Sequence, residues 1–428
     1  MPLTVVIALA LLTSGGDVTI GSGTLKAGGT GSREIATETS RSRIAQASAP
    51  MPPSNPKIRA SRFTGPSVTR NIFRSRSNGS SVFLFYGEFM KIDCYLPPSL
   101  PGAAVPAAEK AARLGYDGFF TAETTHDPFF PLVLAASAAP DLDLGTAIAV
   151  AFPRSPMITA MISWDLAAMS EGRFILGLGT QVKAHITRRF SQAWDSPGPR
   201  LADYIRSLKA IWDTWQNQVP LRYDGEFYQF SLMTPFFDPG PISHPDIPVA
   251  IAGVGPYLSR LAGELCDGFH VHPFHTPAYL DQVVLPNIAA GAASAGRELD
   301  DCERITTVFV VTGSTPAEME QSMAAVKQQI SFYASTPSYA PVLEASDWDF
   351  GPRLTAMSKR GQWAEMADVI TDDVVAEVGI VAPVDGLAAA VHDRYGDRVQ
   401  RVGFYTLGDV PALTDEVLGQ VIADVKAG

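Results

Sequence analysis

The sequence predicts an α/β protein built as a (β/α)8 TIM barrel with insertions. From Met90 onward, eight short apolar runs alternate with helical stretches, which is the pattern of repeated strand–helix units. The runs are apolar throughout instead of alternating with polar residues, as expected for parallel strands buried on both faces. A doubly wound sheet is the competing fold, but no GxGxxG follows the first run.

The first four strand–helix units occupy residues 91–215. Each strand is a short apolar run, such as FILGL at 174–178, and a stretch with helical patterning follows it. The predicted pairs are 91–95 with 105–114, 118–122 with 131–139, 142–149 with 157–169, and 174–178 with 203–215.

The second half repeats the same unit around two interruptions. Between 218 and 248 the pattern breaks, and YDGEFYQF predicts an inserted hairpin. Strand and helix then resume as 249–252 with 257–265, 269–272 with 279–295, and 306–311 with 316–333, and a final strand covers 402–407. The long segment 334–374 precedes that strand, and we expect it to cover the barrel mouth and to influence specificity.

Composition excludes several classes of function. The 428 residues are 46% hydrophobic and 18% charged, which is enough apolar material for a large core. The net charge of −11 argues against a nucleic-acid binder, which needs a basic face. The three cysteines are scattered without a CxxC pair, so we expect a reducing, cytoplasmic location. No apolar run reaches the roughly 20 residues that a membrane span needs.

Residues 1–89 differ from the rest of the chain. They carry ten Lys and Arg against four Asp and Glu, and they are rich in Gly, Ser and Pro without a lasting helical or strand period. We interpret them either as a basic low-complexity tail or as over-called coding sequence upstream of a true start at Met90, and we favour the second. The predicted barrel domain is 90–428.

Charged side chains are expected at the mouth of this barrel, because active sites of such barrels lie at the carboxyl ends of the strands. The segment TAETTHDPFF follows the second strand. We predict Glu123 and His126 within it as the catalytic acid–base residues, since a carboxylate at a strand end needs a partner or a ligand.

Two glycine turns follow neighbouring strands of the predicted barrel, GLGT after the fourth and GVGP after the fifth. Glycines let a backbone approach a ligand closely, and Pro256 suits the first position of a helix whose free N–H groups favour an anion. With Lys183, Arg188 and Arg189 nearby, the two turns predict a phosphate site. The alternative is that the glycines only end strands and the proline only begins a helix.

Three histidines follow in HVHPFH. His270 and His272 are two residues apart on a predicted strand and share a face, and His275 follows in the loop. A metal site, a wall of an organic-ligand pocket and simple packing all stay open. We predict no metal.

Several motifs in this order resemble the bacterial luciferase-like superfamily, and within it the F420-dependent oxidoreductases. They are GRFILGLG, YDGEFYQF and GVGPYLSRLAGELCDG, and the likeness runs from about Met90 to Leu407. The resemblance implies a (β/α)8 barrel that holds a flavin or deazaflavin at its carboxyl-terminal mouth. It also implies a non-prolyl cis peptide near Ala147–Ile148 that supports the ring.

The resemblance carries a set of cofactor-binding residues onto this chain. They are Ala147, Ile148, Gly179, Thr180, Gln181, Val182, Lys183, His185, Ala252, Gly253, Val254 and Gly255. One departure concerns the proton-handling histidine that members place directly after the acid of the second strand. Here Thr124 follows Glu123, so that role passes to His126.

The leading hypothesis is an F420-dependent oxidoreductase that transfers a hydride between the deazaflavin and a small organic substrate. An FMN-dependent luciferase-like monooxygenase is the first alternative. A metal-dependent barrel hydrolase built on the three histidines and a non-enzymatic flavin-binding relative are the others. The resemblance also implies a homodimer, and we expect neither a nucleic-acid nor a membrane partner.

Overall fold

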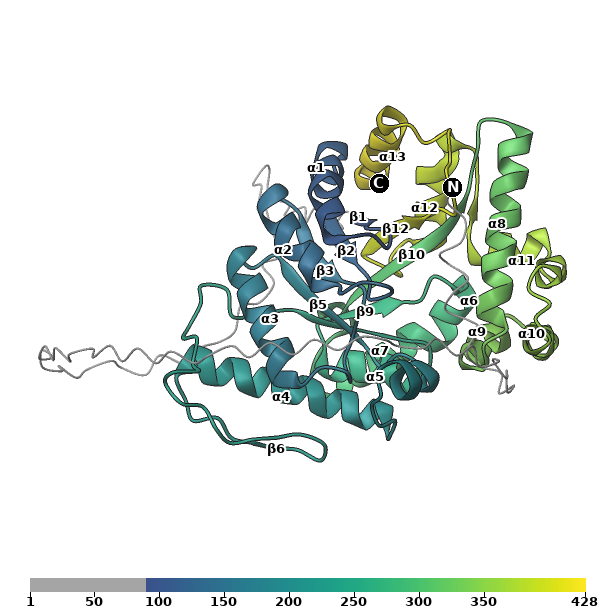
Figure 1. Ribbon diagram of the computed structural model, residues 1–428. Helices are drawn as coiled ribbons and strands as arrows, with labels where there is room; N and C mark the ends of the chain where they lie inside the picture. The colour runs from purple at the N-terminus through teal and green to yellow at the C-terminus, as the bar shows by residue number, and fades with distance from the viewer. Residues whose placement is uncertain (1–89) are drawn as a thin grey trace, which may run out of the picture. The chain divides into compact units, whose positions relative to one another are not determined.

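The structure is a computed structural model that describes residues 90–428, so the expectations for residues 1–89 lie outside the described residues. In the described part, eight parallel strands close into a barrel, because β12 pairs with both β10 and β1 (Figure 1). The predicted (β/α)8 fold is confirmed. The barrel strands are β1 (Lys91–Tyr95), β2 (Gly118–Thr121), β3 (Asp143–Thr146), β5 (Phe174–Gly179), β8 (Val249–Gly253), β9 (Gly268–Val271), β10 (Glu303–Val311) and β12 (Arg401–Tyr405).

Small residues make room inside the barrel for large ones. A Cβ added at Gly145 would fall 2.3 Å from the Phe120 ring, so only glycine lets this ring fill the interior. A Cβ added at Gly177 would fall 1.8 Å from the carbonyl oxygen of Thr146 on the neighbouring strand. The Thr146 hydroxyl in turn donates to the Gly177 carbonyl at 2.7 Å, which ties β3 to β5 in the core.

Helices form an outer layer around the strands. Neighbouring members of this layer pack on one another in chain order on one side of the barrel, from α1 through α4 (Figure 1). The outer helices are α1 (Ala104–Leu114), α2 (Phe129–Ala138), α3 (Pro156–Met169), α4 (Pro197–Asn217), α5 (Pro256–Leu265), α6 (Pro277–Tyr279), η4 (Leu280–Val284), α7 (Leu285–Ser294), α8 (Pro316–Ala334), α12 (Leu387–Tyr395) and α13 (Asp415–Ala427).

The two interruptions are insertions, as predicted. The first contains the expected antiparallel hairpin, β6 (Tyr223–Asp224) and β7 (Gln229–Phe230). The second is a helical segment that contains η6 (Pro337–Tyr339), α9 (Ala340–Ala345), α10 (Gly351–Lys359), η7 (Glu365–Val369) and α11 (Asp372–Val378).

Some elements were not predicted from the sequence. They are α12, α13, the two-residue strand β11 (Ile380–Val381), which pairs with β10, and β4 (Ala149–Val150), which pairs with β5. The predicted strand 142–149 is in fact two pieces, because β3 ends at Thr146 and the Ala147–Ile148 peptide bond is cis.

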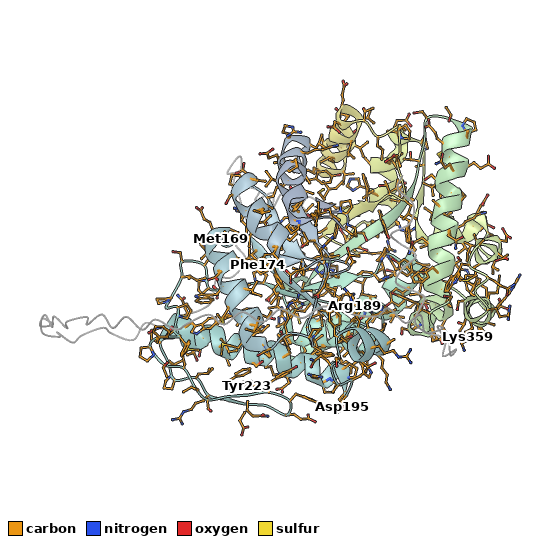
Figure 2. The ribbon with its side chains drawn as sticks, viewed as in Figure 1. Met169, Phe174, Arg189, Asp195, Tyr223 and Lys359 are labelled. Carbon is orange, nitrogen blue, oxygen red and sulfur yellow. The ribbon has the colours of Figure 1, made fainter. Side chains whose placement is uncertain are left out.

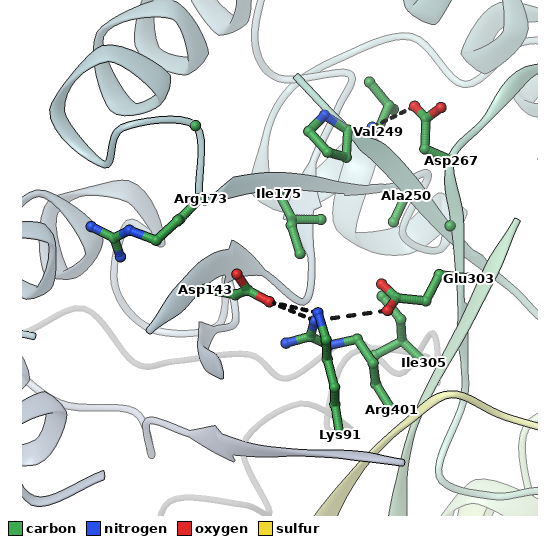
Figure 3. A pocket seen from close by; sticks show the side chains of 13 residues that line it. Lys91, Asp143, Arg173, Ile175, Val249, Ala250, Asp267, Glu303, Ile305 and Arg401 are labelled. Atoms are coloured by element: carbon green, nitrogen blue, oxygen red, sulfur yellow. Dashed lines mark hydrogen bonds and ion pairs between the residues drawn. The ribbon is translucent and has the colours of Figure 1, made fainter. Parts of the chain in front are cut away.

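The amino-terminal end of the barrel is closed by charged side chains. Arg401 is fully buried and pairs with Asp93 at 2.6 Å and with Asp143 at 2.7 Å. Lys91 also reaches Asp143, and Figure 3 shows Lys91 and Arg401 around this carboxylate. Burial alone would lower the pKa of Arg401, but Asp93 and its other carboxylate neighbours raise it well above its ordinary value. A cavity of about 230 Å³ lies against this network. Because its lining comes from the starts of the strands, it lies opposite the mouth.

Candidate functional site at the carboxyl ends of the strands

Glu123 hydrogen-bonds to the backbone of the segment that follows β3. Its amide donates to the carbonyl oxygen of Ile148 at 3.0 Å, and its carboxylate accepts from the amide of Val150 at 2.7 Å. It therefore holds the chain on both sides of Ala149, directly after the cis peptide bond that joins Ala147 to Ile148. The bulge, residues 147–150, is thus held from the end of β2.

Arg154 neutralises this carboxylate and extends the network. Its Nη1 lies 2.6 Å from Glu123 and its Nη2 lies 2.7 Å from Asp127, while the guanidinium packs 5.4 Å from the centre of the Phe129 ring. The Glu123 side chain is only 6% exposed, against 16% for Arg154 and 33% for Asp127. Burial favours a lower pKa for Arg154, but bonds from both carboxylates raise it. Arg154, which follows the third strand, therefore bridges two carboxylates of the loop after β2.

The predicted cofactor residues of three neighbouring strands meet at the mouth. A Cβ added at Gly179 would fall 2.7 Å from Cδ1 of Ile148, so the end of β5 lies directly under the bulge. Gly179 also pairs with Ala252 of β8. Gln181 has a φ of 57° and its side chain accepts from the amide of Val182 at 3.0 Å, which sets the turn that leads to Lys183.

The GVGP turn leaves the start of α5 open. Gly255 is the residue before the helix, Pro256 is its first residue, and no side chain caps it. A Cβ added at Gly255 would meet nothing within 4 Å. The hydroxyl of Tyr279 donates to the carbonyl oxygen of Val254 at 2.6 Å, which fixes the turn from behind. The start of α5 thus has open space beside Gly255 and no side-chain cap, two features that an anion site at a helix start requires.

Basic side chains follow β5 on η3 (His185–Arg189). Lys183 is exposed and His185 is partly buried. The Arg189 guanidinium donates to the carbonyl oxygen of Thr124 and lies over the Phe190 ring at 4.8 Å. This joins the loop after β5 to the loop after β2.

His126 is exposed in the loop after β2, three residues beyond Glu123. Glu123, by contrast, is engaged with Arg154. The structure thus brings the bulge, the GLGT turn and the GVGP turn together, and it places the two predicted acid–base residues in different surroundings.

The three histidines of HVHPFH do not converge. His270 points into the barrel, where its ring meets Phe120 edge-on, and burial lowers its pKa to about 3. His275 donates from Nδ1 to the carbonyl oxygen of His272 at 2.8 Å and accepts at Nε2 from Tyr395 at 3.1 Å. Among residues 90–428, no group of three or more His, Cys, Asp or Glu is arranged to hold a metal ion. The histidine-based hydrolase therefore has no support.

His272 belongs to an aromatic cluster that reaches from β9 to the second insertion. Its Nδ1 accepts from the amide of Phe274 at 3.1 Å, so the neutral ring carries its proton on Nε2 and donates it to Tyr339 at 2.9 Å. Burial lowers the pKa of His272 to about 3. Tyr339 belongs to η6, so this part of the 334–374 segment lies against the end of β9. That the segment covers the mouth and influences specificity stays a prediction.

The pairing of Arg154 with Glu123 and the bond between Tyr339 and His272 were not predicted from the sequence. A signal existed for Arg154, because it follows the third strand as Glu123 follows the second, and the ends of adjacent parallel strands meet. No local pattern pointed to Tyr339, which lies 67 residues from His272.

Comparisons with known proteins identify the family of this chain. A sequence model of the luciferase-like monooxygenase family matches residues 91–401, and the chain belongs to this family. An uncharacterized protein of Mycobacterium tuberculosis is 43% identical over 314 residues, which cover 73% of this chain and 92% of that protein. A second M. tuberculosis protein, provisionally named a coenzyme F420-dependent oxidoreductase, is 28% identical over 313 residues, which cover 68% of this chain and 85% of that protein.

A solved structure shows the same fold. The coenzyme F420-dependent tetrahydromethanopterin reductase of Methanopyrus kandleri superposes with a TM-score of 0.65 at 21% identity, over 79% of this chain and 99% of that chain. The predicted luciferase-like superfamily is confirmed. The residues predicted to bind the cofactor, the homodimer and the cytoplasmic location stay predictions. No helix among residues 90–428 is long and apolar enough to cross a membrane.

Proposed function

We propose that the protein is an oxidoreductase that uses coenzyme F420 to transfer a hydride to or from a small organic substrate. The observation that carries the proposal is the meeting of three features on neighbouring strands, namely the bulge at residues 147–150 that Glu123 holds, the turn after Gly179 and the open turn before α5. The relative that is provisionally named an F420-dependent oxidoreductase supports the choice of cofactor.

The residues at the mouth fit a cofactor with a planar ring and a phosphate. Gly255 leaves open space before α5, where the uncapped amides would hold the phosphate together with Lys183. The bulge would support the ring, with Ile148 against Gly179 beneath it. When bound, the deazaflavin supplies hydride chemistry at its C5. We assign these roles to Ala147, Ile148, the segment Gly179–Lys183, His185 and the segment Ala252–Gly255.

The two predicted acid–base residues receive different roles. Glu123 accepts from Val150 and Arg154 and is nearly buried, so we propose that it positions the bulge. His126 is exposed in the loop after β2 and is free to exchange a proton with a substrate at the mouth. His126 is therefore our candidate for proton transfer.

An FMN-dependent monooxygenase is the second candidate, because the matching family is described as luciferase-like monooxygenases. The same bulge and the same open turn would serve FMN, whose ring is planar and whose phosphate is anionic. The two candidates differ in which cofactor binds and in whether dioxygen is consumed.

A binding titration tests the proposal. Oxidised F420 and FMN are each added to the full-length protein, and binding is followed by fluorescence. We expect F420 to bind at least about tenfold more tightly than FMN. Preference for FMN, with oxygen uptake once the flavin is reduced, would move the assignment to a monooxygenase. Binding of neither cofactor would refute both candidates.

Substitutions at Gly255 test the site itself. Gly255→Glu places a carboxylate in the open space before α5 and should weaken cofactor binding at least about tenfold by repelling the phosphate. Gly255→Gln is the matched control, because it has the same size without the charge. The φ of Gly255 is −99°, which any residue adopts, so both variants should fold. Equal loss in the two variants would mean that bulk, not anion binding, matters here.

A further inference from the structure

Aromatic side chains gather on one side of the barrel mouth, where β9 and β12 end. His272 directly follows β9, and Tyr405 is the last residue of β12. Tyr333, in the last turn of α8, and Tyr339 of η6 contact the His272 ring. All four side chains are partly exposed. We call these four residues the aromatic wall.

The rings of the aromatic wall form one connected group. The centre of the His272 ring lies 4.6 Å from that of Tyr333 and 4.6 Å from that of Tyr339. Tyr405 joins them through Phe309, whose buried ring stacks on Tyr405 at 4.9 Å and lies 6.3 Å from Tyr333. The hydroxyl of Tyr339 accepts from Nε2 of His272 at 2.9 Å, which fixes both rings. The wall is therefore a set of rings held in fixed positions.

The aromatic wall is electrically neutral. Burial lowers the pKa of His272 to about 3, so its ring carries no charge at neutral pH. Burial raises the pKa of Tyr339 and of Tyr405, so both hydroxyls keep their protons. Among residues 90–428, no Asp, Glu, Lys or Arg contributes to these three pKa values. Lys359, at the end of α10 in the second insertion, is exposed to solvent (Figure 2).

The aromatic wall lies across the mouth from the predicted cofactor residues. The barrel order is β1, β2, β3, β5, β8, β9, β10 and β12, and in a closed barrel of eight strands each strand faces the one four places along. β12, which ends at Tyr405, therefore faces β5, which ends at Gly179. β10 faces β3, which leads into the bulge. A molecule in the mouth would have the bulge and the GLGT turn on one side and the aromatic wall on the other.

The chemistry of the two sides differs. The side of the GLGT turn carries the basic residues Lys183 and Arg189. The aromatic wall offers ring faces for stacking and phenol hydroxyls for hydrogen bonds. A flat ring with a carbonyl or hydroxyl group matches both properties, whereas a phosphate or carboxylate would lose its water there without meeting a cation. Packing of the second insertion alone would need no hydroxyls, and the buried Phe274 and Phe309 have none.

We propose that the substrate is an uncharged molecule with a flat aromatic or conjugated ring and a carbonyl or hydroxyl group, and that the aromatic wall binds it. The ring lies against Tyr333 and Tyr405, and the Tyr405 hydroxyl bonds to the oxygen of the substrate. This inference rests on the proposed function for the reaction, but binding at the wall does not require the cofactor.

A matched pair of probes tests the proposal. 2-Acetylnaphthalene is a flat neutral ketone, and 2-naphthoate has the same rings with a carboxylate. Each is added to the full-length protein without cofactor, and binding is followed by saturation-transfer difference NMR. We expect a Kd of about 1 mM or tighter for the ketone, which a rigid ligand of this size can reach. The Kd of 2-naphthoate should be at least about tenfold weaker.

Substitutions in the wall locate the binding. Tyr405→Leu and Tyr339→Leu should each weaken ketone binding at least about tenfold, because each removes a ring. Both positions are partly exposed, so circular dichroism should show an unchanged fold. Tyr405→Phe keeps the ring and loses the hydroxyl, so the loss should be about threefold to tenfold. Phe236→Leu is the matched control, since it removes a ring that is 89% exposed in the first insertion, and it should bind the ketone normally.

Four results separate the proposal from its competitors. No binding of the ketone, or equal binding of the ketone and 2-naphthoate, would overturn it. Equal losses in Phe236→Leu would also overturn it, because the ketone would then be held by exposed rings in general. Displacement of the ketone by saturating F420 would do the same, since the rings would then belong to the cofactor site. A protein that binds the ketone at the wall but neither F420 nor FMN would refute the proposed function and support the wall as a binding site.

Discussion

Arg154→Met is the sharpest test of the site, because the Arg154 guanidinium joins Glu123, Asp127 and the bulge. The substitution removes the bonds to Glu123 at 2.6 Å, to Asp127 at 2.7 Å and to the Val150 carbonyl oxygen at 3.2 Å. It keeps most of the apolar stem of the side chain. It leaves the Glu123 carboxylate, which is 6% exposed, without a counterion.

The expected loss follows from this burial. Removing one partner of a fully buried ion pair costs about 3–5 kcal/mol. Arg154 is 16% exposed and Asp127 is 33% exposed, so water screens part of the interaction and we expect the free energy of unfolding to fall by about 2–3 kcal/mol. Denaturant unfolding followed by circular dichroism measures this loss. Cofactor affinity should fall with it, since the bulge loses its support.

A double-mutant cycle that combines Arg154→Met with Glu123→Gln tests whether Glu123 is a positioning residue or an acid–base residue. The double variant contains no unpaired buried charge, so it should be about 1–2 kcal/mol more stable than the sum of the single effects implies. A coupling below about 0.5 kcal/mol would refute the role of Glu123 as a positioning residue. It would favour the original expectation that Glu123 acts as an acid or base, which a change in the pH profile of turnover would then support.

Three further predictions concern the barrel and the bulge. Arg401→Met leaves Asp93 buried without its partner, so the free energy of unfolding should fall by about 3–5 kcal/mol in denaturant titrations. Adding Asp93→Asn to the same chain should restore part of this loss. A loss under about 1 kcal/mol would contradict the role of the pair. Burial holds the pKa of His270 and of His275 at about 3, against about 6.5 in the unfolded chain. The unfolded chain therefore binds protons that the folded state does not. The free energy of unfolding should fall as pH drops from 6.5 towards 3, by up to about 2.7 kcal/mol per pH unit for the two histidines together. If His275→Asn leaves the dependence of the unfolding free energy on pH unchanged, the reasoning fails. Gly179→Val should push the bulge away and weaken cofactor binding at least about tenfold while far-ultraviolet circular dichroism stays unchanged; normal affinity would mean that the bulge does not contact the cofactor.

The eight strands could be predicted because a parallel strand buried on both faces is a local pattern. Most runs of the barrel, such as FILGL at 174–178, are apolar without alternation, and that pattern does not depend on distant residues. β11 has only two residues and carries no such pattern, and the strand predicted for 142–149 was wrong because its residues are apolar on both sides of the break at Ala147. Local hydrophobicity does not record where a strand bends.

The partners within the site could not be predicted in the same way. The strand predicted for 269–272 ends at Val271, so His272 does not continue the face of His270 and turns instead to Tyr339. Glu123 was recognised as a polar residue at a strand end, but its engagement with Arg154 arises only when the barrel brings the two strand ends together. The position of Glu123 in the sequence placed it at the mouth of the barrel. Only the tertiary contacts show that its carboxylate is engaged in an ion pair with Arg154.

The bond from Arg154 has a consequence for redesign. The loops after β2 and β3 are joined through one guanidinium, whereas the turn after β5 is set by a bond that the amide of Val182 donates to the side chain of its neighbour Gln181. The loop beyond Gln181 carries the proposed cofactor residue Lys183 and reaches Thr124 through Arg189, so it is tied to the loop after β2 by a separate bond. Glu123, Asp127 and Arg154 have to be exchanged together, as a single part of the molecule.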